Sequence, residues 1–485
     1  MRINRKLVIV ICLFLFISLW AGTTVSYAEQ KTVPRDWDRL TSSNGSLRAS
    51  AVKSEAAILM DAHTGQVLFE KHADAKMYPA SITKIMTCVV VLENAKLSDL
   101  VTIGHIGSME KGAKKVGLAK DEILSVEYLL YGLMLHSGND AGVALAVHVA
   151  GSVEAFADLM NEKAKEIGMT GSHFVNPHGL HDSNHYTTAR DMATLVRYAQ
   201  RTHPDFVKIV STYKYTWFET NKCDKKRTWL NSNRLIKPQD TFYFEYATGV
   251  KTGYTGAALH TLVTSAEKGD QSLISVVLRH KEANTKWNDS TTMFLYGFEF
   301  YDTIKLSNLL ANNEVIVDVS NAATTTTFDK LKLLMRPQVQ TYLTDKKSVI
   351  EDLRQNPERF QQQIQVPENL SAPITKDQLI GTVDFLHNDE VVLTCDLIAA
   401  HAVEPVPIAT AEPTPEPQST PVPGTVDKPD SGIPDLWLYV GGGAVALIIL
   451  IIALLSARRT TRYRQYNQSN PSTRRREPKH SRRRY

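Results

Sequence analysis

The sequence predicts an α+β domain over residues 51–300, a smaller β-rich domain over 303–400 and a transmembrane helix near the C-terminus. Three observations support this division. Residues 51–300 mix strand-like and helix-like apolar patterns, residues 303–400 follow a two-residue period, and residues 436–456 contain no charged side chain. A chain of 485 residues, of which 43% are hydrophobic, is also too long for one ordinary core, so several domains are expected.

Short apolar segments define the elements of the α+β domain. Strands are expected at 56–60, 66–69, 262–265 and 273–279, because each pair flanks a turn that contains glycine. Helices are expected at 82–93, 126–135 and 140–150, where the patterns favour helix. The helix at 82–93 is strongly apolar, so it is predicted to lie at the centre of the domain.

The second domain has a different pattern. Val315, Val317 and Val319 alternate with polar residues, which is typical of a strand with one buried face. Residues 380–385 and 391–397 flank the turn His387-Asn388-Asp389, as in a β-hairpin. The sequence therefore predicts a β-rich domain that follows the first.

The N-terminal residues 1–28 are typical of an export signal. Three basic residues precede the apolar stretch 7–21, and Ser26-Tyr27-Ala28 supply the small residues of a cleavage site. The mature chain is expected to begin at Glu29, with 29–50 as a lead-in to the first domain. An uncleaved membrane anchor is the alternative interpretation.

The C-terminal region predicts a membrane anchor. Residues 436–456 are 21 uncharged residues, enough to cross a bilayer as a helix, and Trp437 and Tyr439 lie near one end. Arginines follow from Arg458, which predicts a cytoplasmic C-terminus and a body outside the cell membrane, held by a single pass. The segment 404–434 contains nine prolines and is expected to be a semi-rigid spacer.

Charge is concentrated at the two ends of the chain. The tail, 457–485, carries ten arginines, one lysine and one glutamate, although the whole chain has a net charge of only +4. The central region is therefore acidic, which argues against nucleic acid as a partner. Anionic lipid headgroups are the simplest partner for the tail.

The sequence gives no sign of a metal site or a required cofactor. Cys88, Cys223 and Cys395 are far apart, so neither a disulfide framework nor a zinc site is expected. His178, His181 and His185 lie in a predicted loop without an acidic partner at a recognised ligand spacing.

Three short motifs occur in order along the first domain: Ser81-Ile82-Thr83-Lys84, Ser137-Gly138-Asn139 and Lys251-Thr252-Gly253. The triple is typical of class A β-lactamases and penicillin-binding proteins. Each motif alone has an ordinary explanation as a helix cap, a polar loop or a Gly-rich turn. Their order and their predicted positions, at a helix start, in a loop and on a strand, favour one catalytic site.

The first motif combines a nucleophile with a base. Ser81 is expected at a helix N-terminus, where free N–H groups and the helix dipole favour an oxyanion. Lys84 lies three residues later on the same face of the helix. It can remove the proton of Ser81 only when its amine is neutral, and both burial by Ile82 and Ile85 and a nearby Lys251 would lower its pKa. Such Ser–Lys pairs perform nucleophilic catalysis.

The other two motifs supply polar groups for a peptide substrate. The hydroxyl of Ser137 can donate and accept, so it can relay a proton, and the Asn139 amide can bind a backbone carbonyl. The glycines beside Lys251 allow another backbone to approach an edge strand. Lys251 and Thr252 together can hold a carboxylate.

These segments resemble the low-molecular-weight penicillin-binding proteins, the serine D-Ala-D-Ala carboxypeptidase family (peptidase S11). Residues 78–87, 176–180 and 186–193 are similar to segments typical of that family. The resemblance covers residues 50–300 and extends less specifically to 303–400. It implies a β-lactamase/transpeptidase-like catalytic domain, with an antiparallel sheet and helices, followed by the family's β-rich domain.

The resemblance also implies a role for each motif residue. Ser81 would be the nucleophile, Lys84 the general base and Ser137 the proton relay. The substrate-binding residues would be Asn139, Lys251, Thr252, Gly253 and Tyr254. The backbone N–H groups of Ser81 and Tyr254 would form the oxyanion hole, so histidine, which the family often has in place of Tyr254, is not required. Arg279 is a weaker candidate for carboxylate recognition, because a surface ion pair explains it more simply.

The expected partners are peptidoglycan stem peptides that end in D-Ala-D-Ala, with β-lactams as inhibitors. Three alternatives stay open. A class A β-lactamase would carry a Glu-x-x-Leu-Asn segment, and none occurs between Ser137 and Lys251. A DD-endopeptidase would cut cross-links with the same residues. A non-catalytic wall scaffold would be expected to have lost a catalytic residue, and none is missing.

Overall fold

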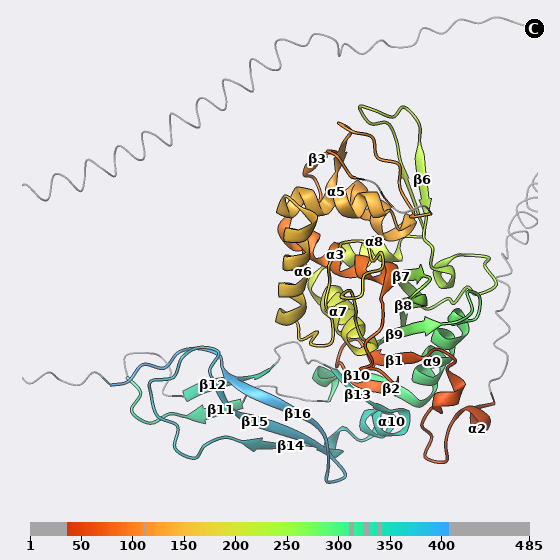
Figure 1. Ribbon diagram of the computed structural model, residues 1–485. Helices are drawn as coiled ribbons and strands as arrows, with labels where there is room; N and C mark the ends of the chain where they lie inside the picture. The colour runs from red at the N-terminus through yellow and green to blue at the C-terminus, as the bar shows by residue number, and fades with distance from the viewer. Residues whose placement is uncertain are drawn as a thin grey trace, which may run out of the picture. The chain divides into compact units, whose positions relative to one another are not determined.

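The computed structural model describes residues 36–107, 109, 112–309, 315–323, 330–336 and 342–406 (Figure 1). The predicted signal peptide, most of the proline-rich spacer, the predicted transmembrane helix and the basic tail lie outside these residues. Within the described part, no single helix is long and apolar enough to cross a membrane, whereas the bent pair Asn139–Ala150 and Val153–Glu166 meets that criterion jointly.

A five-stranded antiparallel sheet forms the centre of the first domain, with the strand order β2-β1-β9-β8-β7. The strands are β1 (Ala56–Asp61), β2 (Val67–Lys71), β7 (Ala247–Thr255), β8 (Leu259–Lys268) and β9 (Gln271–His280). The four predicted strands are confirmed, each with slightly different ends. The strand that carries Lys251, β7, lies at one edge of the sheet, so one side of its backbone is free to pair with another chain.

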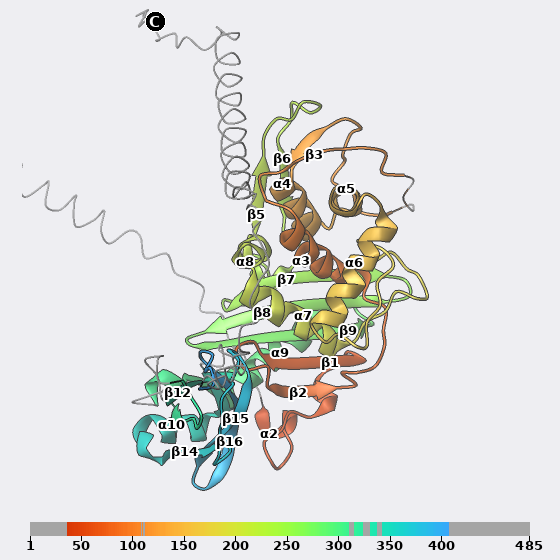
Figure 2. The same cartoon turned by 90° about the vertical axis from the view of Figure 1, so that its left-hand side faces the viewer.

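Apolar side chains cover both faces of this sheet. Successive residues of β1 alternate, so that Ile58 packs into one core and Leu59 into another. The first core contains residues of six helices, seen together on one side of the sheet in Figure 2. The other face is covered by α9 (Lys286–Phe300), and α2 (Trp37–Leu40) packs there too. The six helices are α3 (Lys84–Asn94), α4 (Val126–Tyr131), α5 (Asn139–Ala150), α6 (Val153–Glu166), α7 (Ala189–Thr202) and α8 (Pro204–Ser211).

The predicted central helix is confirmed, because every residue of α3 from Lys84 to Val91 is buried. The predicted helix 126–135 begins as α4 and ends as a π-helical turn, Gly132–His136. A side chain at position 132 would press against Val116 and Trp229, so glycine allows this wider turn to pack closely. Two short ribbons complete the domain: β3 (Leu100–Thr102) with β4 (Ile123–Ser125), and β5 (Lys214–Trp217) with β6 (Arg227–Leu230).

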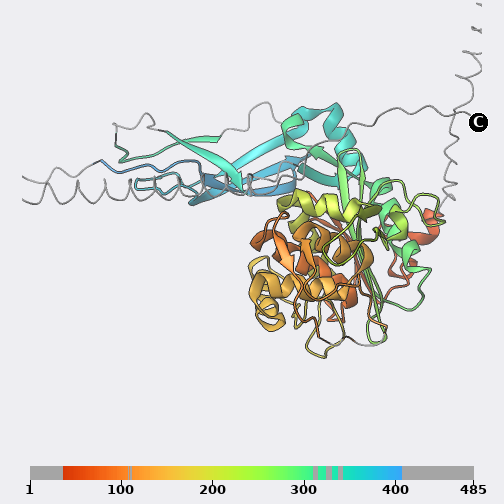
Figure 3. The same cartoon turned by 90° about the horizontal axis from the view of Figure 1, so that it is seen from above.

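A second antiparallel sheet, in the order β11-β12-β16-β15-β14, forms the β-rich region, and Figure 3 shows it nearly edge-on. Its strands are β11 (Val315–Asp318), β12 (Lys330–Arg336), β14 (Phe360–Gln365), β15 (Leu379–His387) and β16 (Glu390–Ala399). Strands β10 (Tyr301–Lys305) and β13 (Tyr342–Lys346) pair separately, and α10 (Lys347–Gln355) follows β13. The region has its own apolar core.

The predicted hairpin of the β-rich region is confirmed. Strands β15 and β16 pair in antiparallel register and are joined by Asn388 and Asp389. Both residues have positive φ values, 51° and 66°. Asparagine and aspartate tolerate this left-handed conformation better than most residues, which explains their use in a two-residue turn.

Candidate active site

Ser81 and Lys84 lie side by side where the chain enters α3. Ser81 belongs to a 3-10 turn, Ala80–Thr83, and Lys84 is the first residue of α3. The Nζ of Lys84 donates a hydrogen bond to Ser81 Oγ at 3.0 Å. The serine is thus in the tighter turn that precedes the expected helix, and Ala80, with a φ of 52°, bends the chain just before it.

Lys84 is completely buried, yet its ammonium group has three hydrogen-bond acceptors. Besides Ser81, Nζ donates to Asn139 Oδ1 at 2.7 Å and to the carbonyl of His178 at 2.6 Å. Burial, and then the charges of Lys251 and Lys114, lower the pKa of Lys84 well below its usual value. A buried amine that loses its proton readily is suited to act as a base toward the neighbouring hydroxyl.

Ser137 and Asn139 reach the same site from the loop between the π-helical turn and α5. Ser137 adopts a left-handed conformation, with φ 67° and ψ 34°, and is buried. This backbone reversal ends one helix, and α5 begins two residues later at Asn139. The second motif therefore meets the first through the hydrogen bond between Asn139 and Lys84.

A loop that carries a further lysine, Lys114, is attached to this motif by backbone hydrogen bonds. The carboxylate of Asp140 accepts hydrogen bonds from the backbone N–H groups of Val116, at 2.8 Å, and Gly117, at 2.9 Å. The N–H of Asn139 donates to the carbonyl of Lys114 at 2.8 Å. These bonds attach the segment around Lys114 to the second motif, although sequence spacing gave no sign of it.

The third motif lies on the edge strand β7. The Nζ of Lys251 donates to the carbonyl of Thr252 at 3.1 Å, and Lys251 is fully buried. Burial, helped by the charge of Lys114, lowers the pKa of Lys251 to about 7. At Gly253 a Cβ would come within 2.9 Å of the Ser81 nitrogen, so glycine lets β7 approach the serine. Tyr254 is exposed and its ring stacks on His260, with 4.6 Å between centroids.

A cavity of about 420 Å³ joins the three motifs. The sequence-predicted residues in its wall are Ser81, Ser137, Asn139, Thr252, Gly253 and Tyr254. Lys84 and Lys251 lie behind this wall, where they contact its members. The geometry therefore brings all eight predicted residues together, six at the surface of the cavity and two beneath it.

Lys286, at the start of α9, is a cavity residue that the sequence did not indicate. It is largely buried, and its Nζ donates to the carbonyl of Ala283 at 2.9 Å. Burial and then the charge of Arg234 lower its pKa to about 8. No local pattern marks this lysine, because only the packing of α9 against the sheet brings it to the cavity.

The segment after Asn176 closes the site around α3. Asn176 Oδ1 accepts from the backbone N–H of Gly179 at 2.7 Å, which holds a tight turn. Gly179 has a φ of 81°, and a Cβ there would collide with the carbonyl of Ala80. His185 Nε2 lies 2.7 Å from Thr83 Oγ1. Burial lowers the pKa of His185 to about 4, so this histidine is neutral at pH 7 and packs against the catalytic turn.

The other candidate residues are elsewhere. Arg279 pairs with Glu55 at 2.8 Å and does not line this cavity, in agreement with the surface ion pair expected for it. In the described part of the chain, no group of three histidine, cysteine, aspartate or glutamate side chains is arranged to hold a metal ion. Cys88, Cys223 and Cys395 are free.

The site is a cavity lined by an edge strand and by a serine that accepts a hydrogen bond from a buried lysine. This arrangement defines a serine acyl-transfer enzyme. Residues 43–282 match the family described as "D-alanyl-D-alanine carboxypeptidase", and residues 309–405 match "Penicillin-binding protein 5, C-terminal domain". The chain belongs to the D-alanyl-D-alanine carboxypeptidase family. It combines the family's β-lactamase-like domain with its β-rich C-terminal domain.

Individual relatives agree with this assignment. The chain is 33% identical over 347 residues to D-alanyl-D-alanine carboxypeptidase DacF of Bacillus subtilis, which covers 70% of this chain and 83% of the relative. It is 33% identical over 369 residues to DacC of Escherichia coli, with 74% and 86% covered. The crystal structure of penicillin binding protein 5 from Haemophilus influenzae superposes with a TM-score of 0.60 at 29% identity, covering 73% of this chain and 98% of that chain.

Proposed function

We propose that this protein is a serine-type D-Ala-D-Ala carboxypeptidase that removes the terminal D-Ala from peptidoglycan stem peptides. The observation that carries the proposal is the 3.0 Å hydrogen bond from the buried Lys84 to Ser81, at the floor of a cavity edged by β7. The names of the relatives supply the substrate class. β-Lactams would act as inhibitors, because they mimic the D-Ala-D-Ala end.

Acylation begins when neutral Lys84 takes the proton of Ser81. The Oγ then bonds to the carbonyl carbon of the penultimate D-Ala, and the resulting oxyanion receives hydrogen bonds from the N–H groups of Ser81 and Tyr254. The C–N bond breaks, and the proton passes from Lys84 through Ser137 to the amine of the departing D-Ala. Water then hydrolyses the ester, Lys84 again serving as the base.

Four residues would hold the substrate in register. The Oδ1 of Asn139 accepts the hydrogen bond from Lys84, so its amide N–H₂ remains to donate to a substrate carbonyl. The terminal carboxylate would meet the hydroxyl of Thr252 and the ammonium group of Lys286, which with Lys114 is one of the two lysines in the cavity wall. Lys251, beneath the wall, would act on this carboxylate through its charge and through the carbonyl of Thr252 rather than by direct contact.

The proposal extends to the cell surface. An export signal at 1–28, a spacer at 404–434, a transmembrane helix at 436–456 and a basic cytoplasmic tail at 457–485 would hold the catalytic domain, 51–300, and the β-rich domain, 303–400, outside the membrane. This location suits an enzyme whose substrate is the cell wall. The support for it is the charge and hydropathy pattern of the sequence.

The test uses the full-length chain, purified in detergent. It is incubated with benzylpenicillin and analysed by intact and peptide mass spectrometry, while D-Ala release from a pentapeptide is measured in parallel. We expect a stable adduct on Ser81 and free D-Ala, both lost in Ser81→Ala and both kept in Ser211→Ala, a change at an exposed serine outside the cavity. Rapid penicillin hydrolysis without D-Ala release would indicate a β-lactamase. Cleavage of cross-linked dimers alone would indicate an endopeptidase, and no reaction at all a scaffold.

A further inference from the structure

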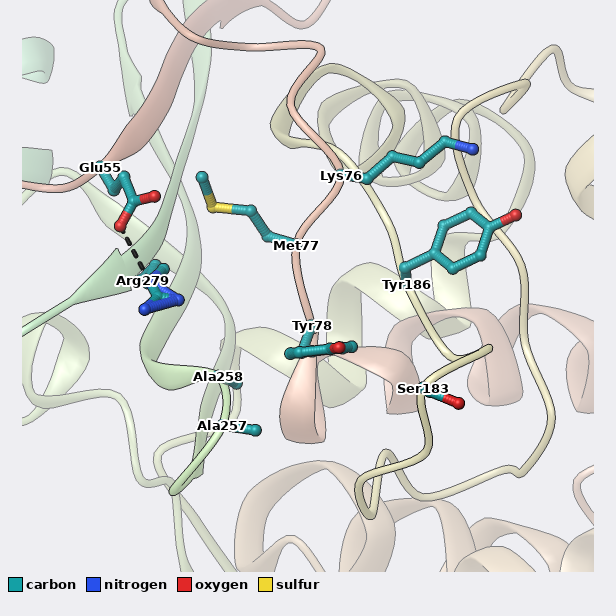
Figure 4. A pocket seen from close by; sticks show the side chains of 9 residues that line it. All are labelled: Glu55, Lys76, Met77, Tyr78, Ser183, Tyr186, Ala257, Ala258 and Arg279. Atoms are coloured by element: carbon teal, nitrogen blue, oxygen red, sulfur yellow. Dashed lines mark ion pairs between the residues drawn. The ribbon is translucent and has the colours of Figure 1, made fainter.

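A second cavity, of about 250 Å³, lies beside the catalytic turn and has no part in the mechanism above (Figure 4). Met77 and Tyr78, which precede the turn, form one wall, and Ala257 and Ala258, between β7 and β8, form another. Met77 is held firmly, because its N–H and C=O both bond to the backbone of Thr187, at 2.8 and 2.9 Å. Backbone hydrogen bonds therefore hold this wall of the cavity in place.

The same two loops line both cavities. Gly179 and Leu180 line the active-site cavity, and Ser183, three residues further along, lines the second. Likewise Thr255 and Gly256 line the first, and Ala257 and Ala258 line the second. The second cavity thus continues from the first along these loops. An extended peptide advances about 3.5 Å per residue. The substrate residue that adjoins the acylated D-Ala would therefore lie along this direction, toward the second cavity.

Charges of both signs border the second cavity. On one side Glu55 and Arg279 form an ion pair at 2.8 Å, and each remains about half exposed. On the opposite side Lys76 lies over the ring of Tyr186, with 4.5 Å from Nζ to the ring centroid. Figure 4 shows these two groups across the cavity, with Met77 and Tyr78 between them. Its walls combine an apolar surface, one carboxylate and two cations.

We propose that this cavity receives the side chain of the stem-peptide residue that precedes D-Ala-D-Ala, and that it selects a side chain ending in both an amine and a carboxylate, as in diaminopimelate. The inference rests on the proposed function. The aliphatic part of the side chain would lie against Met77 and Tyr78. Its carboxylate would accept from Arg279, and its ammonium group would donate to Glu55.

A lysine side chain would satisfy only half of this site. Its ammonium could pair with Glu55, but Arg279 would then lose part of its partner and gain nothing in return. A side chain that carries both charges replaces the existing ion pair with two new ones, so neither Glu55 nor Arg279 is left without a partner. Because these groups are partly exposed, the preference is expected to be moderate rather than absolute.

The test compares two substrates on the full-length protein: acetyl-meso-diaminopimelyl-D-Ala-D-Ala, with a free amine and carboxylate on the side chain, and acetyl-L-lysyl-D-Ala-D-Ala. We expect kcat/KM to be about tenfold higher for the first substrate, expressed mainly in KM. Arg279→Gln should reduce that preference to about twofold or less, and Ser183→Trp, which fills the cavity from an exposed position, should abolish it. Arg359→Gln is the matched control, because Arg359 forms a similar exposed pair with Asp352 at 2.8 Å.

The rate of acylation by penicillin distinguishes a failure of the proposed subsite from a failure of the catalytic site or of folding. Benzylpenicillin carries no diamino acid, so Arg279→Gln and Ser183→Trp should acylate at the unchanged rate, which also shows that they are folded. Equal kcat/KM for both substrates in an active wild type would overturn the subsite and leave the proposed function intact. A preference that survives in both variants would overturn it too. Absence of D-Ala release from either substrate would instead count against the proposed function itself.

Discussion

The two domains differ in what they bury. The first encloses Lys84, Lys251 and Lys286 in its interior. In the described residues of 303–406, by contrast, the only buried polar side chains are Thr303, Thr344 and His387, and the core is otherwise apolar. Burying an ammonium group costs free energy, so a fold keeps several lysines inside only where their chemistry is needed. The contrast assigns catalysis to the first domain and a structural role to the core of the second.

The lysines of the first domain also avoid the cost of buried charge. The pKa of Lys251 falls to about 7 and that of Lys84 falls well below its usual value, chiefly because of burial. The charge of Lys114 adds to both shifts, and the charge of Lys251 lowers the pKa of Lys84 further. At neutral pH Lys84 and Lys251 therefore hold fewer protons than two exposed lysines would, which is the condition that a lysine base requires.

The largest expected effect comes from Lys84. Lys84→Arg keeps a cation but cannot give up its proton at working pH, so penicillin acylation and D-Ala release should both fall by about 10³-fold. In the wild type the acylation rate should rise with pH as Lys84 loses its proton. Stopped-flow acylation measured from pH 5 to 9 tests both points, with the exposed Lys214→Arg as control. A Lys84→Arg enzyme within tenfold of the wild type would show that the buried lysine is not the base.

A cavity-creating substitution in the core of the β-rich region should lower stability without changing catalysis. Phe385 is fully buried and stacks on Phe360, with 5.0 Å between ring centroids. Phe385→Ala is expected to cost about 3–5 kcal/mol of local stability, measured by denaturant unfolding, while the acylation rate at 25 °C stays unchanged. The matched change Phe156→Ala, in the helix-lined core of the first domain, should lower both. Slower acylation by folded Phe385→Ala would contradict the division of roles between the domains.

Local patterns were enough to predict most of the fold. The strands, the central helix and the β15–β16 hairpin follow from spacing and turn residues within short windows. The signals for Ser81, Lys84 and Ser137 are also local, since each motif is a few residues long. Features that depend on distant packing were missed, such as the tight turn before Lys84 and the π-helical turn after α4.

The site was predicted less completely than the fold. Lys114 and Lys286 reach the cavity through a loop held by Asp140 and through the packing of α9, and neither has a sequence signature. The different positions of Lys251 and Thr252 were predictable in principle, because neighbouring residues of a strand point to opposite faces. That rule separates the buried Lys251 from the Thr252 hydroxyl that faces the cavity.

Lys286 differs from Lys84 in the protonation state that the proposed function needs. Lys84 must be neutral to act as a base, whereas Lys286 must keep its positive charge to hold the carboxylate. Its pKa of about 8 means that it is protonated at pH 7 and becomes neutral as the pH rises through 8. The KM for D-Ala-D-Ala peptides should therefore increase several-fold between pH 7 and 9, with a smaller change in kcat. In Lys286→Arg the KM should stay level over this range, because arginine remains charged, whereas Lys286→Met should show the raised KM already at pH 7. If the KM of Lys286→Arg rises with pH as steeply as that of the wild type, the carboxylate is held by another group, and Lys251, whose pKa of about 7 places the loss of its charge at the lower edge of this range, would be the first to test.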